Sequence, residues 1–186
     1  MSNSARKQDA ARPPIPGGRH GWETTVDNTT LQRGLIVYFR LALGWTFLYA
    51  GAWQIMDPHW SVATFLAHTK TFHDVFALFA APGIEPYTTF AVKWGHLLIG
   101  LSLVSGLLIR VSGVFGVMLM LTYYFAHMDF PYVDSPVNYI MEFHLVYAGV
   151  LVYLMSVRAG TVFGLDGVVE RLHLFDRQRA ADAMAR

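Results

Sequence analysis

The chain has 186 residues, of which 54% are hydrophobic and 15% are charged. A soluble domain of this size carries more charge, so the composition indicates an integral membrane protein. The formal net charge of +1 gives no global field that would attract nucleic acid, and no nucleic-acid partner is expected. The absence of cysteine excludes disulfides, cysteine-held iron–sulfur clusters and thiolate metal sites.

The first predicted membrane helix follows a polar N-terminal segment. Residues 1–33 carry repeated Arg and Gly and no long apolar run, which predicts a disordered tail. Gly34–Met56 is apolar and forms the first predicted span, which Asp57 and Pro58 end. One helical face of this span carries Arg40, Gly44, Phe47, Gly51 and Gln54. Its glycines favour close contact with another helix.

The second predicted span is preceded by an amphipathic segment. Residues 59–83 mix histidines and charged residues with aromatics, which predicts one or two interfacial helices lying on the membrane. Pro86–Arg110 is predominantly apolar, and its residues Pro86–Ile109 reach about 36 Å as a helix, enough to cross a bilayer. Lys93 and His96 lie inside its first half. Ionisable residues within the membrane mark a functional site or a buried partner by default.

Two further spans and a surface segment complete the predicted elements. The third span runs from about Ser112 to Phe130, and Pro131 ends it. Its stripe of small and polar residues comprises Gly113, Gly116, Met120, Tyr123 or Tyr124, and His127. The fourth span is predicted over about Pro136–Ser156, with Ser135 as its N-cap. Residues 159–186 are predicted to form an amphipathic helix at the membrane surface.

Together these elements predict an all-α membrane protein. Residues 34–158 would form a four-transmembrane-helix bundle, with a tail at 1–33 and an amphipathic tail at 159–186. Lys and Arg gather in both termini and in the second-to-third turn, whereas the two opposite loops hold only Lys70. The positive-inside rule therefore places both termini in the cytoplasm, across a prokaryotic inner membrane. Residues 59–83 then lie on the extracytoplasmic side.

The polar and charged side chains within the predicted spans lie mostly in one half of the membrane. All but Arg40 lie in the extracytoplasmic half of the predicted bundle, which indicates a polar pocket open to the outside. These residues are Gln54, Lys93, His96, His127, Asp129, Asn138, Glu142 and His144.

Residues at the same depth in the membrane are predicted to pair. Lys93 lies at about the depth of Glu142, and His96 lies at about the depth of His144. Positions 142 and 144 are about 200° apart on a helix, so both pairs cannot form between the same two helices. Glu142 is predicted to face the bundle and to pair with Lys93, which leaves His144 to face another helix, a partner subunit or a cofactor. The alternative is that the Lys93–Glu142 ion pair only holds the helices together.

Two cofactor alternatives stay open at this stage. A metal site from His127, Asp129 and a loop histidine lacks tight ligand spacing, so no metal is assigned. A haem b held by His96 and His144 is the second alternative, because these residues lie on different helices at one depth.

Four stretches resemble the DoxX/DoxD family of small membrane proteins. They are YFRLALGWTFLYAGAWQIMDP, GHLLIGLSLVSGLLIRVSG, FPYVDSPVNYIMEFHLVYAGVLVYL and FGLDGVVERL. Within that family the chain is most similar to the DoxD-type small subunit of thiosulfate:quinone oxidoreductase. The resemblance implies a four-helix membrane bundle that oxidises thiosulfate to tetrathionate and passes electrons to quinone, alongside a second subunit. It matches the family's arginine to Arg40 and its glycines to Gly44 and Gly51, but Gln54 stands where many members have lysine.

The residues and the resemblance together predict a quinone-linked redox subunit. His96 is assigned proton transfer, Lys93 holds a small anion or the developing quinol oxygen, and Glu142 keeps Lys93 charged. The remaining substrate- and quinone-binding candidates are His127, Asp129, Asn138, His144, Gln54, Tyr124 and Arg40. Expected partners are the lipid bilayer and a membrane subunit or a second copy of the chain. The alternative function is an accessory subunit that stabilises a larger membrane oxidoreductase complex.

Overall fold

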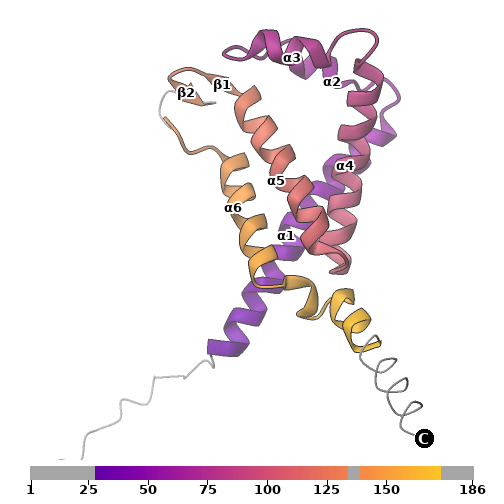
Figure 1. Cartoon of the computed structure of the whole chain (residues 1–186), viewed down its shortest axis with the longest axis vertical. Helices are drawn as coiled ribbons and strands as arrows, with labels where there is room; N and C mark the ends of the chain where they lie inside the picture. The colour runs from indigo at the N-terminus through magenta and orange to yellow at the C-terminus, as the bar shows by residue number, and fades with distance from the viewer. Residues whose placement is uncertain (1–27, 134–138, 173–186) are drawn as a thin grey trace, which may run out of the picture.

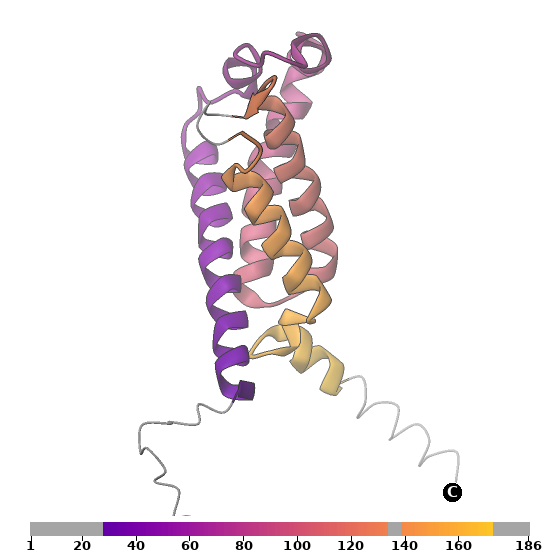
Figure 2. The same cartoon turned by 90° about the vertical axis from the view of Figure 1, so that its left-hand side faces the viewer.

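The computed structural model describes residues 28–133 and 139–172. Four long helices run side by side as a bundle (Figures 1 and 2): α1 (Asn28–Met56), α4 (Glu85–Ser105), α5 (Ile109–Ala126) and α6 (Phe143–Ser156). Two helical stretches, Thr29–Met56 and Ile109–Ala126, are long and apolar enough to cross a membrane by length and composition. Four complete spans therefore remain a prediction, while the predominantly helical architecture is confirmed.

One end of the bundle is covered by short elements (Figure 1). Helices α2 (Val62–Leu66) and α3 (His73–Phe79) lie across it, so the segment between the first two long helices is helical, as predicted. Strands β1 (Met128–Asp129) and β2 (Tyr132–Val133) form an antiparallel hairpin at the same end. The third long helix was expected to continue to Phe130 but ends at Ala126, because the chain pairs as a hairpin there instead.

Glycines bring α1 and α4 into backbone contact. A Cβ placed on Gly51 would lie 2.4 Å from the Leu97 nitrogen, and one on Gly100 would lie 2.3 Å from the Leu48 nitrogen. Only a residue without a side chain fits at such distances. The prediction that the glycines of the first span permit close helix contact is confirmed, and Gly100 supplies the matching position on α4.

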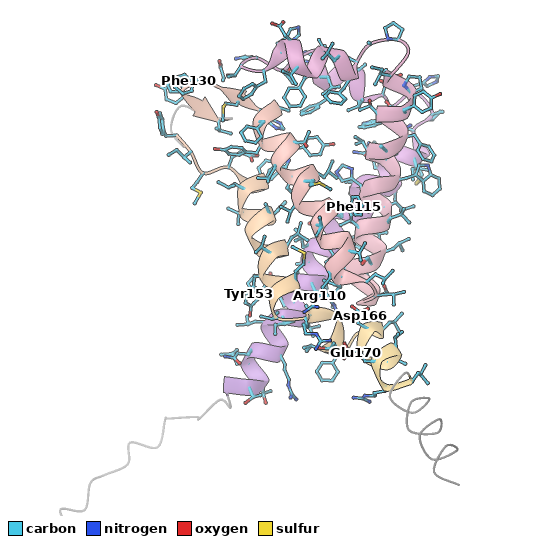
Figure 3. The ribbon with its side chains drawn as sticks, viewed as in Figure 1. Arg110, Phe115, Phe130, Tyr153, Asp166 and Glu170 are labelled. Atoms are coloured by element: carbon cyan, nitrogen blue, oxygen red, sulfur yellow. The ribbon has the colours of Figure 1, made fainter. Side chains whose placement is uncertain are left out.

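The connection between α4 and α5 differs from the predicted turn at Arg110. Helix α4 ends at Ser105, and its C-cap Gly106 has φ 71°, a left-handed conformation that glycine adopts without strain. Arg110 instead lies in the first turn of α5. The Asp166 carboxylate accepts hydrogen bonds from the backbone N–H groups of Leu108 (2.8 Å) and Ile109 (3.4 Å). Figure 3 shows Asp166 at this end of the bundle.

Arg40 fastens the chain that follows α6 to this same end. Its guanidinium donates to the backbone carbonyls of Ala159 (3.1 Å), Val162 (2.8 Å) and Phe163 (3.1 Å). These residues belong to or follow the short 3-10 helix η1 (Ala159–Thr161), after which residues 165–172 are helical. The start of α1 and the described C-terminal residues therefore lie at one end of the bundle, opposite α2 and α3 (Figure 1).

The fourth long helix is shorter than predicted. It was expected from about Pro136, but residues 139–142 are not helical and α6 begins at Phe143. Ser135 and Pro136, the predicted start, lie outside the described residues. As a helix of 14 residues, α6 spans about 21 Å, which is less than the roughly 30 Å hydrocarbon core of a bilayer.

Candidate functional site

Glu142 starts α6 and binds His144. Its carboxylate accepts a hydrogen bond from the backbone N–H of His144 at 2.8 Å, which caps the helix. The other carboxylate oxygen lies 2.7 Å from Nδ1 of the same histidine. Both side chains are buried, with the residues 4% and 8% exposed. A carboxylate only accepts hydrogen bonds when ionised, so this contact places a proton on Nδ1 of His144.

A third histidine packs against this pair from the end of α5. His127 is the C-cap of α5, and its ring stacks on the His144 ring with centroids 5.1 Å apart. Its Nδ1 lies 2.9 Å from the backbone carbonyl of Tyr123. Phe65 of α2 contacts the His127 ring at 5.2 Å, so the short interfacial segment covers this cluster. The ends of two long helices and α2 therefore meet at the histidines.

Tyr123 links these residues to the buried histidine of α4. The Tyr123 ring lies 5.2 Å from the His144 ring and 5.7 Å from the His96 ring. His96 is 5% exposed, and its Nδ1 lies 2.8 Å from the Val92 carbonyl. The predicted binding residue Tyr124 is half-buried and instead donates to the Ile140 carbonyl. The sequence left Tyr123 or Tyr124 open in the stripe, and binding was assigned to Tyr124. The spacing of Met120, Tyr123 and His127 at i, i+3 and i+7 could have indicated Tyr123 instead.

A cavity of about 190 Å³ lies among these side chains. Helices α1, α4, α5 and α6 all line it. Its polar residues include His96, Tyr123 and His144, and the rest of the wall is largely apolar and aromatic. The lining comprises Thr46, Phe47, Ala50, His96, Met120, Tyr123, Phe143, His144 and Tyr147. An apolar hollow with a few converging polar groups is the usual form of a small-molecule site.

The predicted Lys93–Glu142 ion pair does not form. The Lys93 amine donates to the Asp57 carbonyl at 3.4 Å and lies 5.5 Å from the Trp60 ring centre. Glu142 is engaged by His144 instead. The prediction was wrong because it placed Glu142 on a helix face, whereas the residue precedes the helix as its N-cap. For the same reason both Glu142 and His144 are buried, although a helix would have separated them by about 200°.

Comparison with protein-family models matches residues 35–128 to the DoxX family. This match covers half of the chain. The chain belongs to the DoxX family. Searches of curated proteins and of solved structures gave no match. DoxX membership makes the chain a membrane protein of a family broadly linked to quinone-related oxidoreductases, as the sequence resemblance implied.

The outward faces of the helices fit a membrane environment. Large apolar side chains are exposed along all four, including Trp45, Phe90, Phe115 and Val152. A monomer in water rarely exposes contiguous apolar surface on this scale, whereas lipid tails solvate it.

The DoxX segment contains His96, Tyr123 and His127, whereas Glu142 and His144 lie beyond its matched residues. The structure brings these five residues together, although the sequence assigned His127 and His144 no common partner. Two of these five residues therefore come from a part of the chain that the family match does not reach.

The other predicted binding residues lie elsewhere or outside the description. Arg40 is buried at the opposite end of the bundle, where it holds the chain after α6 rather than a ligand. Asp129 is exposed on the hairpin and pairs with Lys70 at 2.6 Å. Gln54 is buried near the end of α1 but does not line the 190 Å³ cavity. Asn138 lies outside the described residues.

Proposed function

We propose that this chain is a quinone-linked redox subunit of a prokaryotic inner-membrane oxidoreductase. The observation that supports it is the 190 Å³ cavity, whose apolar wall carries His96, Tyr123 and His144. Small-molecule sites typically measure about 300–1,000 Å³, so this cavity takes a ring-sized head group and leaves a long apolar tail outside. A quinone has this form, and its tail would extend between the helices into lipid.

The buried histidines supply what quinone reduction requires of a protein. Reduction to the quinol consumes two electrons and two protons, and the protons must reach both ring oxygens. Because Nδ1 of His96 faces the Val92 carbonyl, which only accepts hydrogen bonds, its proton resides there and Nε2 is the basic nitrogen. His144 is held in the same tautomer by Glu142. In the proposal Nε2 of His96 and Nε2 of His144 each take up a proton from the extracytoplasmic side and then donate it to a quinone oxygen, which returns both rings to the neutral form. Tyr123 positions the quinone ring.

The electron donor we propose is thiosulfate, two of which give tetrathionate and two electrons. A second hollow, of about 470 Å³, lies at the covered end of the bundle and is lined by His59, Trp60 and His68 among others. Lys93 lies against Trp60, so its ammonium contributes positive charge beside this hollow. The Lys93 ammonium and the N–H donors of the lining suit a small anion arriving from the extracytoplasmic side, although the Asp57 carboxylate also lines the hollow. The chain has no cysteine to store electrons, so a partner membrane subunit is proposed to complete the path.

The decisive experiment measures thiosulfate-dependent reduction of a short-chain quinone. Membranes from a host without this activity would be compared with and without the chain and its co-purifying subunits. His96→Ala is expected to lower kcat by about 100-fold or more, since general acid–base catalysis contributes about 10²–10⁴-fold. Lys93→Ala is expected to raise the KM for thiosulfate more than the KM for quinone. His73→Ala is the control, because His73 is exposed and lines neither hollow, and it is expected to leave kcat and both KM values unchanged.

Three outcomes would change the assignment. Activity that survives the combined His96→Ala and Lys93→Ala change would remove both residues from the site. A chain that co-purifies within a complex whose activity ignores these changes would be an accessory subunit. A Soret band in the purified protein would point to a haem in place of a freely exchanging quinone.

A further inference from the structure

We infer that His127, Glu142 and His144 form a binding site for a divalent transition-metal ion. Each of the three residues offers one ligand atom, and these atoms all lie within 4.8 Å of one another. Two of the residues are buried and the third is half-buried. The site is formed where α5 ends and α6 begins, so the fold rather than a local sequence motif assembles it.

The hydrogen bonds of the two histidines favour metal binding. His127 directs Nδ1 to the Tyr123 carbonyl, and His144 directs Nδ1 to the Glu142 carboxylate. The contact of His127 places its proton on Nδ1 and leaves Nε2 as its ligand atom. Metal-binding histidines commonly have this arrangement, in which a carbonyl fixes the tautomer and the ring orientation. Nδ1 of His144 faces the Glu142 carboxylate, so an ion held by both residues takes the place of the proton between them, and that proton is released on binding. The His127 and His144 rings stack with centroids 5.1 Å apart and an interplanar angle of 28°.

Glu142 retains capacity to bind a cation. An ionised carboxylate has about four lone-pair positions, and the contacts with His144 occupy two of them. Zinc binds nitrogen and oxygen ligands at about 2.0–2.2 Å, so tetrahedral ligand atoms lie roughly 3.4 Å apart. Side-chain rotations that shorten the largest separation by about 1.4 Å, from 4.8 Å, would bring the ligand atoms to that distance.

Two histidines and one carboxylate define the class of ion. This donor set holds Zn²⁺ in catalytic sites and Fe²⁺ in non-haem sites, and it leaves at least one position open to water or substrate. His144 also lines the 190 Å³ cavity, so the bound ion would border that cavity. The inference goes beyond the proposed function, because metal binding does not require that a quinone occupies the cavity.

The test uses the full chain, purified in detergent without a histidine tag and stripped with a chelator. After equilibration with Zn²⁺ and gel filtration, elemental analysis is expected to give one zinc ion per chain. His127→Ala and Glu142→Gln are each expected to weaken zinc binding by at least about tenfold. Glu142→Gln keeps an oxygen that caps α6, so its loss of zinc does not depend on unfolding. His68→Ala is the control, because it removes an exposed histidine outside the cluster.

Cobalt provides a second readout of the same ligands. Co²⁺ bound by two histidines and a carboxylate is expected to give visible d–d absorption that Zn²⁺ abolishes and that Glu142→Gln alters. Zinc binding that is equal in the unchanged chain, His127→Ala and Glu142→Gln would overturn the inference, as would no binding by a folded, monodisperse unchanged chain. No quinone is present in these assays, so their result can refute the metal site without refuting the quinone-linked function, and the reverse holds for the quinone assay.

Discussion

Replacing Gly100 with alanine should loosen the contact between α1 and α4. The new Cβ would lie 2.3 Å from the backbone nitrogen of Leu48, whereas ordinary contacts begin at 3.4 Å. The two backbones would have to separate by about 1.1 Å, because a backbone atom cannot rotate away as a side chain does. Overpacking of this kind costs about 1–3 kcal/mol, and the alanine returns about 0.5–1 kcal/mol of helix propensity. The expected net loss is about 1–2 kcal/mol.

Gly95 provides the matched control on the same helix. A Cβ at Gly95 meets nothing within 4 Å, so Gly95→Ala should raise stability or leave it unchanged. Thermal unfolding of both variants in detergent, followed by circular dichroism, tests the difference. A loss of 1–2 kcal/mol lowers Tm by roughly 2–8 °C in a chain of this size. If Gly100→Ala unfolds at the same temperature as Gly95→Ala, the backbone contact is not as close as the structure shows.

Two further predictions concern the hydrogen bonds of Arg40 and the topology of the chain in the membrane. Arg40→Met leaves three carbonyls without their donor, and hydrogen bonds to charged groups are worth about 1.5–3 kcal/mol each, so we expect a loss of at least about 3 kcal/mol in the same thermal assay. An unchanged Tm would contradict the role of Arg40 in fastening the chain after α6. Reporter fusions after Met56 and after Arg158 should report opposite sides of the membrane, with the second in the cytoplasm. The same side for both would refute four crossings.

The features that depend on local sequence were predictable. Apolar length and glycine spacing predicted the first helix and its close contact through Gly51, and clustered histidines and aromatics predicted the short helices before α4. These features could be predicted because they depend on the periodicity and composition of a local segment, which do not change with the tertiary structure. Individual histidines could also be singled out, because an ionisable residue in an apolar stretch is costly wherever the helix packs.

The relations between those residues required the tertiary structure. Glu142 was predicted to lie on a helix face and to pair with Lys93. In the structure its carboxylate caps α6 and binds His144 instead, so the helix begins later than predicted. Arg40 was a predicted binding residue, yet its guanidinium donates hydrogen bonds to three carbonyls more than a hundred residues away in the sequence. Helix periodicity fixes which face a side chain occupies only once the helix ends are known. The ends were decided by capping and by long-range hydrogen bonds, which sequence spacing does not encode.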